Sequence, residues 1–278
     1  MIRNAILRCK EGRRCKSLRQ KKTPLETSWE QLLKKEEKLC VAKQNKRESK
    51  LNQLLAQKVP DKLQSTLDTA FYKAFLLVFE KGTKLIEKTY NREEQKTVYK
   101  VREYEDALRN NKKSLKAFSK QAGNKGTENV LLSGVSGIGM GLLGIGLPDI
   151  PVFTGMLFRS IYEIALSYGF EYESEEEQYF ILLLIQGAVA YGEEFLELEQ
   201  EINRFPHEKR LPFGYAKEVH ARQAASGLSK ELLYMKFLQG IPIVGAVGGA
   251  YDVIYMNQIT EYAKLKYERR FLEKKMHM

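Results

Sequence analysis

The amino-acid sequence predicts an all-α protein: a single domain of roughly eight or nine helices with a glycine-rich helical hairpin at its centre. Apolar residues recur at three- and four-residue spacing along most of the 278 residues. No stretch alternates in the way that a half-buried strand requires. Three passages, residues 130–147, 178–192 and 237–251, contain no charged residue. These observations favour a bundle whose interior comes mostly from the second half of the chain.

The positive charge is concentrated at the amino terminus. Residues 1–22 contain nine Lys and Arg residues against one acid, which gives +8 of the formal net charge of +11. We therefore predict a disordered basic extension over residues 1–22 and the helical domain over residues 23–278. The extension could contact anionic lipid or nucleic acid, or it could result from a misassigned start codon. It lacks the apolar segment of a secretory signal.

The cysteines give no sign of a disulfide framework. There are three of them, Cys9, Cys15 and Cys40, and none belongs to a C-x-x-C pair. An odd number in a basic and weakly patterned segment is typical of free thiols in a reducing compartment. The sequence therefore favours the cytoplasm, including the inner face of the cell membrane.

Helix signals begin in the first half of the chain. Ser28 is placed to cap a charged helix over residues 29–58, and Pro60 to open a second helix. A third, polar helix is expected over residues 93–119, with Gly123 and Gly126 as the break that follows it. Its mixed charges are typical of a solvated face.

The second half is predicted to contain the buried helices. Ser174-x-x-Glu177 is a capping box in front of an apolar run. Residues 203–214 contain prolines and are expected to form a connector. Helices are expected over residues 151–169, 175–192, 216–239 and 244–274, with an acidic helix after the second of them.

Two of the charge-free passages, the first and the third, are also rich in glycine. The first has 18 residues, just short of the roughly 20 that a membrane-spanning helix needs. The pairs Gly137-x-x-x-Gly141 and Gly245-x-x-x-Gly249 form small faces on which two helices can approach closely. We expect the two passages to form a tightly packed hairpin, with peripheral or re-entrant membrane contact as the alternative.

Few patterns in the sequence indicate a cofactor. Residues 139–144 fit G-x-G-x-x-G, but no strand precedes them and prolines interrupt the helix that should follow. The three histidines, His207, His220 and His277, do not lie at metal-ligand spacing. We therefore expect no cofactor and no metal.

The acids of most interest are Asp149 and Asp252, since each follows a glycine-rich passage. If the passages form a hairpin, these carboxylates could meet and, with Glu163, serve a metal-dependent hydrolase. We favour the alternative that Asp149 caps the helix opening at Pro151 and that Asp252 pairs with a nearby base. Glu163 would then pair with Arg159, four residues earlier.

Three segments carry a resemblance to a known family. They are "GLPDIPVFTGMLFRSIYEIALSYGF" at 146–170, "LLYMKFLQGIPIVGAVGGAYD" at 232–252 and "YAKLKYERRFLEKK" at 262–275. Together they resemble the EcsC family, and the resemblance extends over about residues 25–275. The matching positions are Gly146, Pro148, Asp149, Pro151, Arg159, Glu163, Tyr168 and Gly169 in the first segment, and Gln239, Gly240, Pro242, Gly245, Gly249 and Asp252 in the second.

The resemblance implies kinship without assigning catalytic residues. The founding member of the family is encoded beside an ABC transporter in bacilli, which implies a Bacillus-like source for this chain. We therefore predict a non-enzymatic intracellular accessory protein, associated peripherally with the membrane and linked to an ABC transporter or to protein secretion. The alternative is the hydrolase. Nucleic-acid binding would rest on residues 1–22 alone, and no specific nucleic acid is expected.

Overall fold

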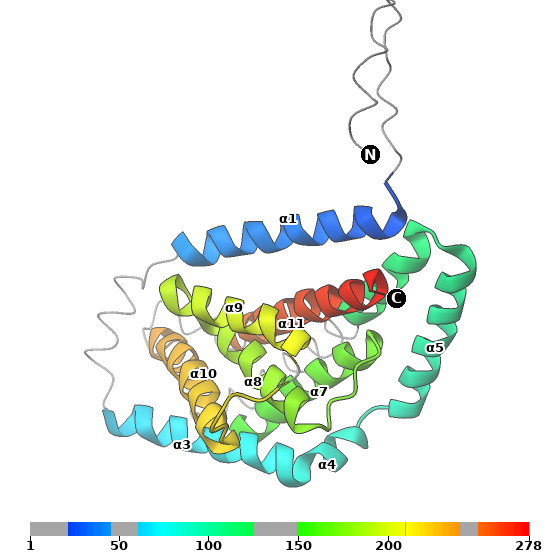
Figure 1. Cartoon of the computed structure of the whole chain (residues 1–278). Coiled ribbons are helices and arrows are strands. Elements are labelled where there is room, and N and C mark those ends of the chain that lie inside the picture. Colours follow the sequence, from blue (N-terminus) through cyan, green and yellow to red (C-terminus); the bar gives the residue numbers. More distant parts are fainter. Residues whose placement is uncertain (1–21, 46–60, 125–148, 209, 240–249, 278) are drawn as a thin grey trace, which may run out of the picture.

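The computed structural model describes residues 22–45, 61–124, 149–208, 210–239 and 250–277; the side chains of residues 81, 85, 149, 233–239 and 250–253 are outside this description. Throughout these ranges the regular structure is helical, which confirms the predicted all-α class (Figure 1). The helices are α1 (Pro24–Asn45), α3 (Asp61–Leu77), the π-helical turn η1 (Val78–Gly82), α4 (Thr83–Glu87), α5 (Arg92–Arg109), a helix over residues 112–124, α7 (Asp149–Ser167), α8 (Glu175–Val189), α9 (Gly192–Glu208), α10 (Lys217–Gln239) and α11 (Ala250–Met276).

Helix α8 lies at the centre of the bundle, because its sequence is apolar on every side. Eleven of its 15 residues are buried, and the exposed ones lie in its first turn, as expected for a helix without a polar face along its length. It packs against α9, α10 and α11, and α7 packs against α3, α5 and α11. The predicted N-cap of α8 is confirmed, since the Ser174 hydroxyl accepts a hydrogen bond from the Glu177 backbone N–H at 3.1 Å.

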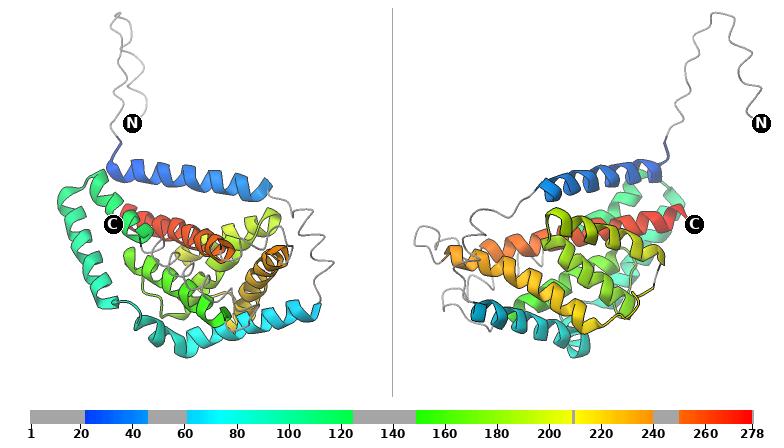
Figure 2. Two further views of the ribbon diagram at one scale, coloured as in Figure 1. Left: turned by 180° about the vertical axis from the view of Figure 1, so that it is seen from behind. Right: turned by 60° about the vertical axis from the view of Figure 1, so that its left-hand side comes forward.

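The remaining helices enclose this core. Helix α1 lies across α9 and α11, while α3, α4 and α5 follow the outside of the bundle in turn (Figures 1 and 2). The start of α1 and the end of α11 lie at the same end of the molecule (Figure 2). In the part of the chain that is described, no helix is both long and apolar enough to cross a lipid bilayer.

The first helix is capped by Thr23, so the assignment of its N-cap to Ser28 is wrong. The Thr23 hydroxyl accepts from the Glu26 N–H at 3.1 Å, and the Glu26 carboxylate accepts from the Thr23 N–H at 2.8 Å. With Pro24 in the first helical position, this is a complete capping box. Ser28 lies inside the helix and donates to the Pro24 carbonyl at 2.9 Å.

The polar helix predicted over residues 93–119 is interrupted. Helix α5 ends at Arg109, where Asn110 adopts a left-handed conformation with φ of 39°. The Asn111 side chain then caps a new helix by accepting from the N–H groups of Lys113 at 2.9 Å and Ser114 at 3.0 Å. An Asn-Asn pair can both end and restart a helix, since asparagine tolerates positive φ and also caps well.

Two further boundaries differ from the prediction. Gly123 lies inside the helix over residues 112–124, and Gly126, the second residue of the predicted break, lies outside the described residues. Helix α9 continues to Glu208 with Pro206 in its last turn, so the connector predicted over 203–214 begins later than expected. A proline near the end of a helix removes only one backbone hydrogen bond there.

The predicted glycine-rich hairpin and the basic extension fall mainly on residues outside the described ranges, so both remain predictions. The motif and packing positions concerned are Gly137, Gly141, Gly146, Pro148, Gly240, Pro242, Gly245 and Gly249.

Candidate functional site

Glu163, the central member of the predicted carboxylate cluster, is held between two helices. It lies on α7 and is 1% exposed. Its carboxylate accepts from Gln95 Nε2 of α5 at 2.7 Å and lies 3.4 Å from Nε of Arg159. The predicted Arg159–Glu163 pair is thus confirmed. A buried carboxylate needs such partners because an unpaired charge in the interior is costly, and these contacts join α5 to α7.

The predicted cluster of Glu163 with Asp149 and Asp252 stays a prediction. Asp149 is the first residue of α7, two positions before the predicted start at Pro151, and Asp252 lies in the first turn of α11. Their side chains are outside the described residues. Across the residues that are described, no group of three or more His, Cys, Asp and Glu side chains is suited to hold a metal ion.

The 262–275 segment on α11 contains a buried ion network. Lys266 is 1% exposed, and its ammonium group donates to the carboxylate of Glu36 on α1 at 2.8 Å and to that of Glu199 on α9. It also donates to Asn203 Oδ1 at 3.0 Å, and the Tyr262 hydroxyl donates to the second oxygen of Glu199. The network therefore joins α1, α9 and α11, and it fixes the outer helix α1 on the bundle.

A second buried pair joins α11 to the start of α8. The Arg270 guanidinium donates to both carboxylate oxygens of Glu177, at 2.7 and 2.9 Å, and lies over the rings of Phe170 and Phe180. The Tyr267 hydroxyl donates to the same carboxylate at 2.6 Å. Of the capping box predicted at Ser174, the structure shows the bond to the Ser174 hydroxyl. The Glu177 carboxylate, which would complete the box, accepts from Tyr267 and Arg270 of α11 instead.

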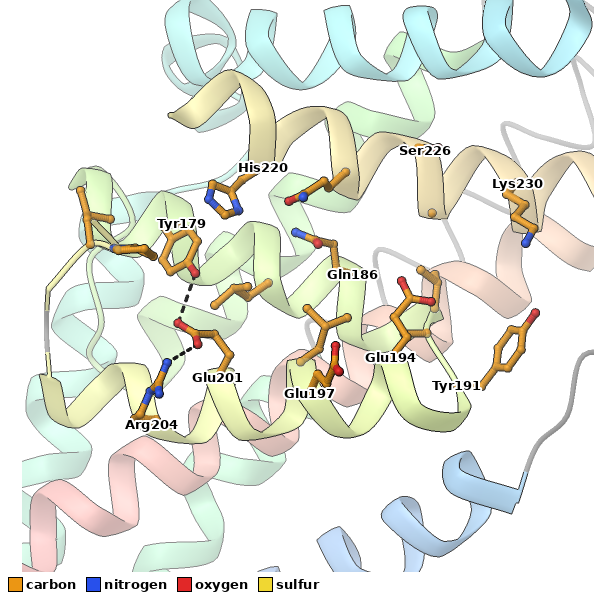
Figure 3. A pocket seen from close by; sticks show the side chains of 18 of the residues that line it. Tyr179, Gln186, Tyr191, Glu194, Glu197, Glu201, Arg204, His220, Ser226 and Lys230 are labelled. Carbon is orange, nitrogen blue, oxygen red and sulfur yellow. Dashed lines mark hydrogen bonds and ion pairs between the residues drawn. The ribbon is translucent and has the colours of Figure 1, made fainter. Parts of the chain in front are cut away.

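Helices α8, α9 and α10 border a cavity of about 950 Å³, which we call the acidic groove. Glu194, Glu197 and Glu201 stand on α9 along one side, and residues of α10 line the other (Figure 3). Arg204 pairs with Glu201, which also accepts a hydrogen bond from the Tyr179 hydroxyl at 3.3 Å. Five glutamates line the groove against two arginines and one lysine, so it favours cationic or basic partners.

A histidine lies at one end of the groove, beside two tyrosines. The His220 ring is 4.8 Å from that of Tyr179 and 5.4 Å from that of Tyr215, measured between centroids. Burial lowers the pKa of His220 below its usual 6.5, and the nearby Glu201 opposes this shift. The imidazole is therefore mainly neutral at pH 7.

The second cavity, which we call the lysine pocket, has a volume of about 700 Å³ and lies between α1, the helix over residues 112–124 and α11. Five lysines line it against one acid, Glu268: they are Lys35, Lys113, Lys116, Lys120 and Lys264. Lys35 pairs with Glu268 at 3.3 Å and Lys264 with Glu261 at 3.6 Å. The other three lysines form no ion pair with any residue that the structure describes. Such a pocket suits an anion.

Sequence reasoning missed both cavities as sites. The polar helix predicted over residues 93–119 includes Lys112, Lys113 and Lys116 on a solvated face of mixed charge, although the stretch 110–124 contains four lysines and no acid. That charge run was the available signal for the lysine pocket. The acidic helix was predicted, but nothing in the sequence placed it opposite α10.

Comparison with known proteins gives one family and one distant relative. The model of the EcsC protein family matches residues 26–272, which include the residues that line both cavities. The chain is 26% identical over 129 residues to "Uncharacterized protein YdbA" of Bacillus subtilis (strain 168). That alignment covers 45% of this chain and 47% of the relative, so the chain matches about half of the relative's length. No solved structure gives a significant match.

Proposed function

This chain belongs to the EcsC protein family, and from that premise we propose that it is a non-enzymatic accessory protein that associates peripherally with the inner face of the cell membrane. The observation that carries the proposal is the lysine pocket, with five lysines against one acid. The cytoplasmic leaflet is negatively charged, and each Lys or Arg near its surface adds about 1 kcal/mol of attraction.

The position of the pocket in the chain and in the fold supports this proposal. The first turns of α1 form one wall, and residues 1–22, with nine basic residues, precede that helix directly. The helix over residues 112–124, which carries Lys113, Lys116 and Lys120, is followed in the sequence by the 18-residue charge-free passage that begins at Val130. Basic and apolar segments that adjoin one another are typical of proteins that lie on a membrane surface.

The link to a transporter or to secretion forms the second part of the proposal, and the acidic groove supports it. Cytoplasmic loops of membrane proteins carry an excess of Lys and Arg. A groove lined by five glutamates and three basic side chains has the complementary charge for such loops. The lysine pocket would then face lipid, and the acidic groove would be available to a membrane protein.

The test is sedimentation of the full chain with vesicles of phosphatidylcholine alone and of phosphatidylcholine with about 25% phosphatidylglycerol. We expect binding to the anionic vesicles only, and we expect it to weaken steeply between about 0.1 and about 0.5 M salt. A protein that stays in the supernatant with both vesicle types at low salt would contradict membrane association.

A further inference from the structure

Three helices that are distant in the sequence each give one face to the lysine pocket. Ser28, Gln31 and Lys35 line it from α1; Lys113, Lys116 and Lys120 from the helix over residues 112–124; and Lys264, Glu268 and Phe271 from α11. Residues three and four apart share a helix face, so each helix contributes side chains from successive turns. The pocket is therefore a junction of three ordered helices.

The lysine row on one of these helices has no counter-charge among the described residues. Lys113, Lys116 and Lys120 follow one another at spacings of three and four, so like charges are neighbours and repel. The acid of the pocket, Glu268, pairs with Lys35 on the opposite wall. An anionic ligand would relieve this repulsion.

A buried hydroxyl also reaches this pocket. Tyr168 follows the last residue of α7 and is 1% exposed, and its hydroxyl has no hydrogen-bond partner in the described part of the chain. The Ser119 side chain, which also lines the pocket, lies close to this hydroxyl, but the two groups are not in hydrogen-bond geometry. Burial raises the pKa of Tyr168 well above its usual value, and the neighbouring Ser119 side chain opposes this shift only in part, so the hydroxyl stays protonated and remains a donor. Buried polar groups are normally satisfied, and an acceptor in the pocket would satisfy this one.

Part of the pocket lining is apolar and buried. Leu115, Phe271 and Leu272 are at most 7% exposed and line the same cavity. Its volume of about 700 Å³ lies within the range of small-molecule sites and far exceeds the space that a single phosphate group occupies. The pocket therefore has room for an organic group as well as for a charged one.

We infer that the lysine pocket binds an organic phosphate, whose phosphate group is held by Lys113, Lys116 and Lys120 and by the Tyr168 hydroxyl, while its organic part lies on the apolar lining. This inference deepens the proposed membrane association by naming the ligand of the same surface. The phosphate can come from a lipid headgroup or from a soluble compound, and the chemistry of recognition is the same.

The central experiment compares two triple variants of the full chain that lose the same charge. The pocket variant is Lys113→Gln with Lys116→Gln and Lys120→Gln. The control variant is Lys62→Gln with Lys100→Gln and Lys112→Gln, three exposed lysines that do not line the pocket. Circular dichroism and thermal melts establish that both variants fold.

Two probes distinguish the sources of phosphate. Inorganic pyrophosphate, measured by titration calorimetry, represents the soluble source. Vesicles with about 20% phosphatidic acid, compared with phosphatidylglycerol vesicles of equal surface charge, represent the lipid source. We expect the pocket variant to lose about tenfold or more in affinity for pyrophosphate, in its preference for phosphatidic acid vesicles, or in both. In the control variant, we expect each of these quantities to change by less than about twofold.

A further variant tests the hydroxyl. Tyr168→Phe keeps the ring and removes the unpartnered group, so a purely structural role predicts unchanged stability and unchanged binding. We expect stability to be kept and the affinity for the probe that the pocket lysines bind, pyrophosphate or phosphatidic acid, to fall by about threefold.

The outcomes separate this inference from the proposed function. Equal losses in the two triple variants, or no pyrophosphate binding together with no preference for phosphatidic acid, would overturn the pocket assignment. Membrane association would still stand if both anionic vesicles bind. Pyrophosphate binding that depends on the pocket, without binding to any vesicle, would keep the pocket and contradict the membrane proposal.

Discussion

Lys266 and the lysine row of the pocket have the same side chain in opposite surroundings. Lys266 is almost fully buried and contacts carboxylates from two other helices. Lys113, Lys116 and Lys120 are exposed and form no ion pair within the described residues. A lysine that is buried with its counter-charges positions helices, whereas a row without them is available to a ligand. Within the family-like segment at 262–275, Lys266 is therefore structural, whereas Lys264 of the same segment lines the pocket.

The largest effect should come from removing Lys266. Lys266→Met leaves Glu36 and Glu199 buried without their shared cation, and we expect a loss of about 3–5 kcal/mol in the free energy of unfolding. Urea denaturation measures it. Lys274→Met, an exposed change on the same helix, should stay within about 0.5 kcal/mol. Equal effects of the two substitutions would mean that the network does not hold α1 in place.

Two adjacent residues at the end of α7 make the comparison sharper. Tyr168 lines the pocket, whereas Gly169 closes the helix with φ of 77°. The N–H groups of Gly169 and Phe170 donate to the carbonyls of Leu166 and Ala165, both at 3.0 Å. This is a Schellman motif, which favours glycine at that position.

Gly169→Ala should therefore be destabilising. A Cβ atom there would lie 2.3 Å from the Tyr99 ring, so we expect a loss of about 2–4 kcal/mol from strain and displacement of the ring. Gly155→Ala in the same helix has no atom within 4 Å of the new Cβ and should gain about 0.5–1 kcal/mol. Thermal unfolding of both variants checks the pair, and a stabilised Gly169→Ala protein would contradict the described turn.

The pocket lysines should behave in the opposite way to Lys266. Replacing Lys113, Lys116 and Lys120 by glutamine removes repulsion between neighbours on the helix, so the free energy of unfolding should change by less than about 0.5 kcal/mol or rise slightly. Urea denaturation without phosphate in the buffer measures this. A loss of several kcal/mol would mean that these lysines have a structural role.

The smallest effect concerns His220, beside the acidic groove. Its pKa in the folded protein is lowered by burial, so the unfolded chain binds a proton first as the pH falls below about 6.5. Stability is therefore fully present above that pH and is lost as the pH falls towards the folded pKa. His220→Gln should flatten this slope, and His277→Gln, at an exposed position, should not. A steeper slope in His220→Gln would contradict the sign of the shift.

The sequence was a good guide to elements and a poor guide to how their faces meet. The helical class, the Ser174 cap and the Arg159–Glu163 pair follow from local spacing, and the structure confirms them. Lys264 and Lys266 are two residues apart on α11, yet one lines the pocket and the other is buried in the ion network. Two positions on a helix point to different sides, but which side is buried depends on α1 and α9, which are distant in the sequence.

The most direct test of the account is phosphate binding by the full chain with the pocket lysines replaced, compared with the charge-matched control at Lys62, Lys100 and Lys112. It is measured both as affinity for pyrophosphate and as affinity for phosphatidic acid vesicles. The account predicts a loss of about tenfold or more for the pocket variant and less than about twofold for the control. Equal affinities in the two variants would contradict the claim that the exposed lysine row forms a phosphate site.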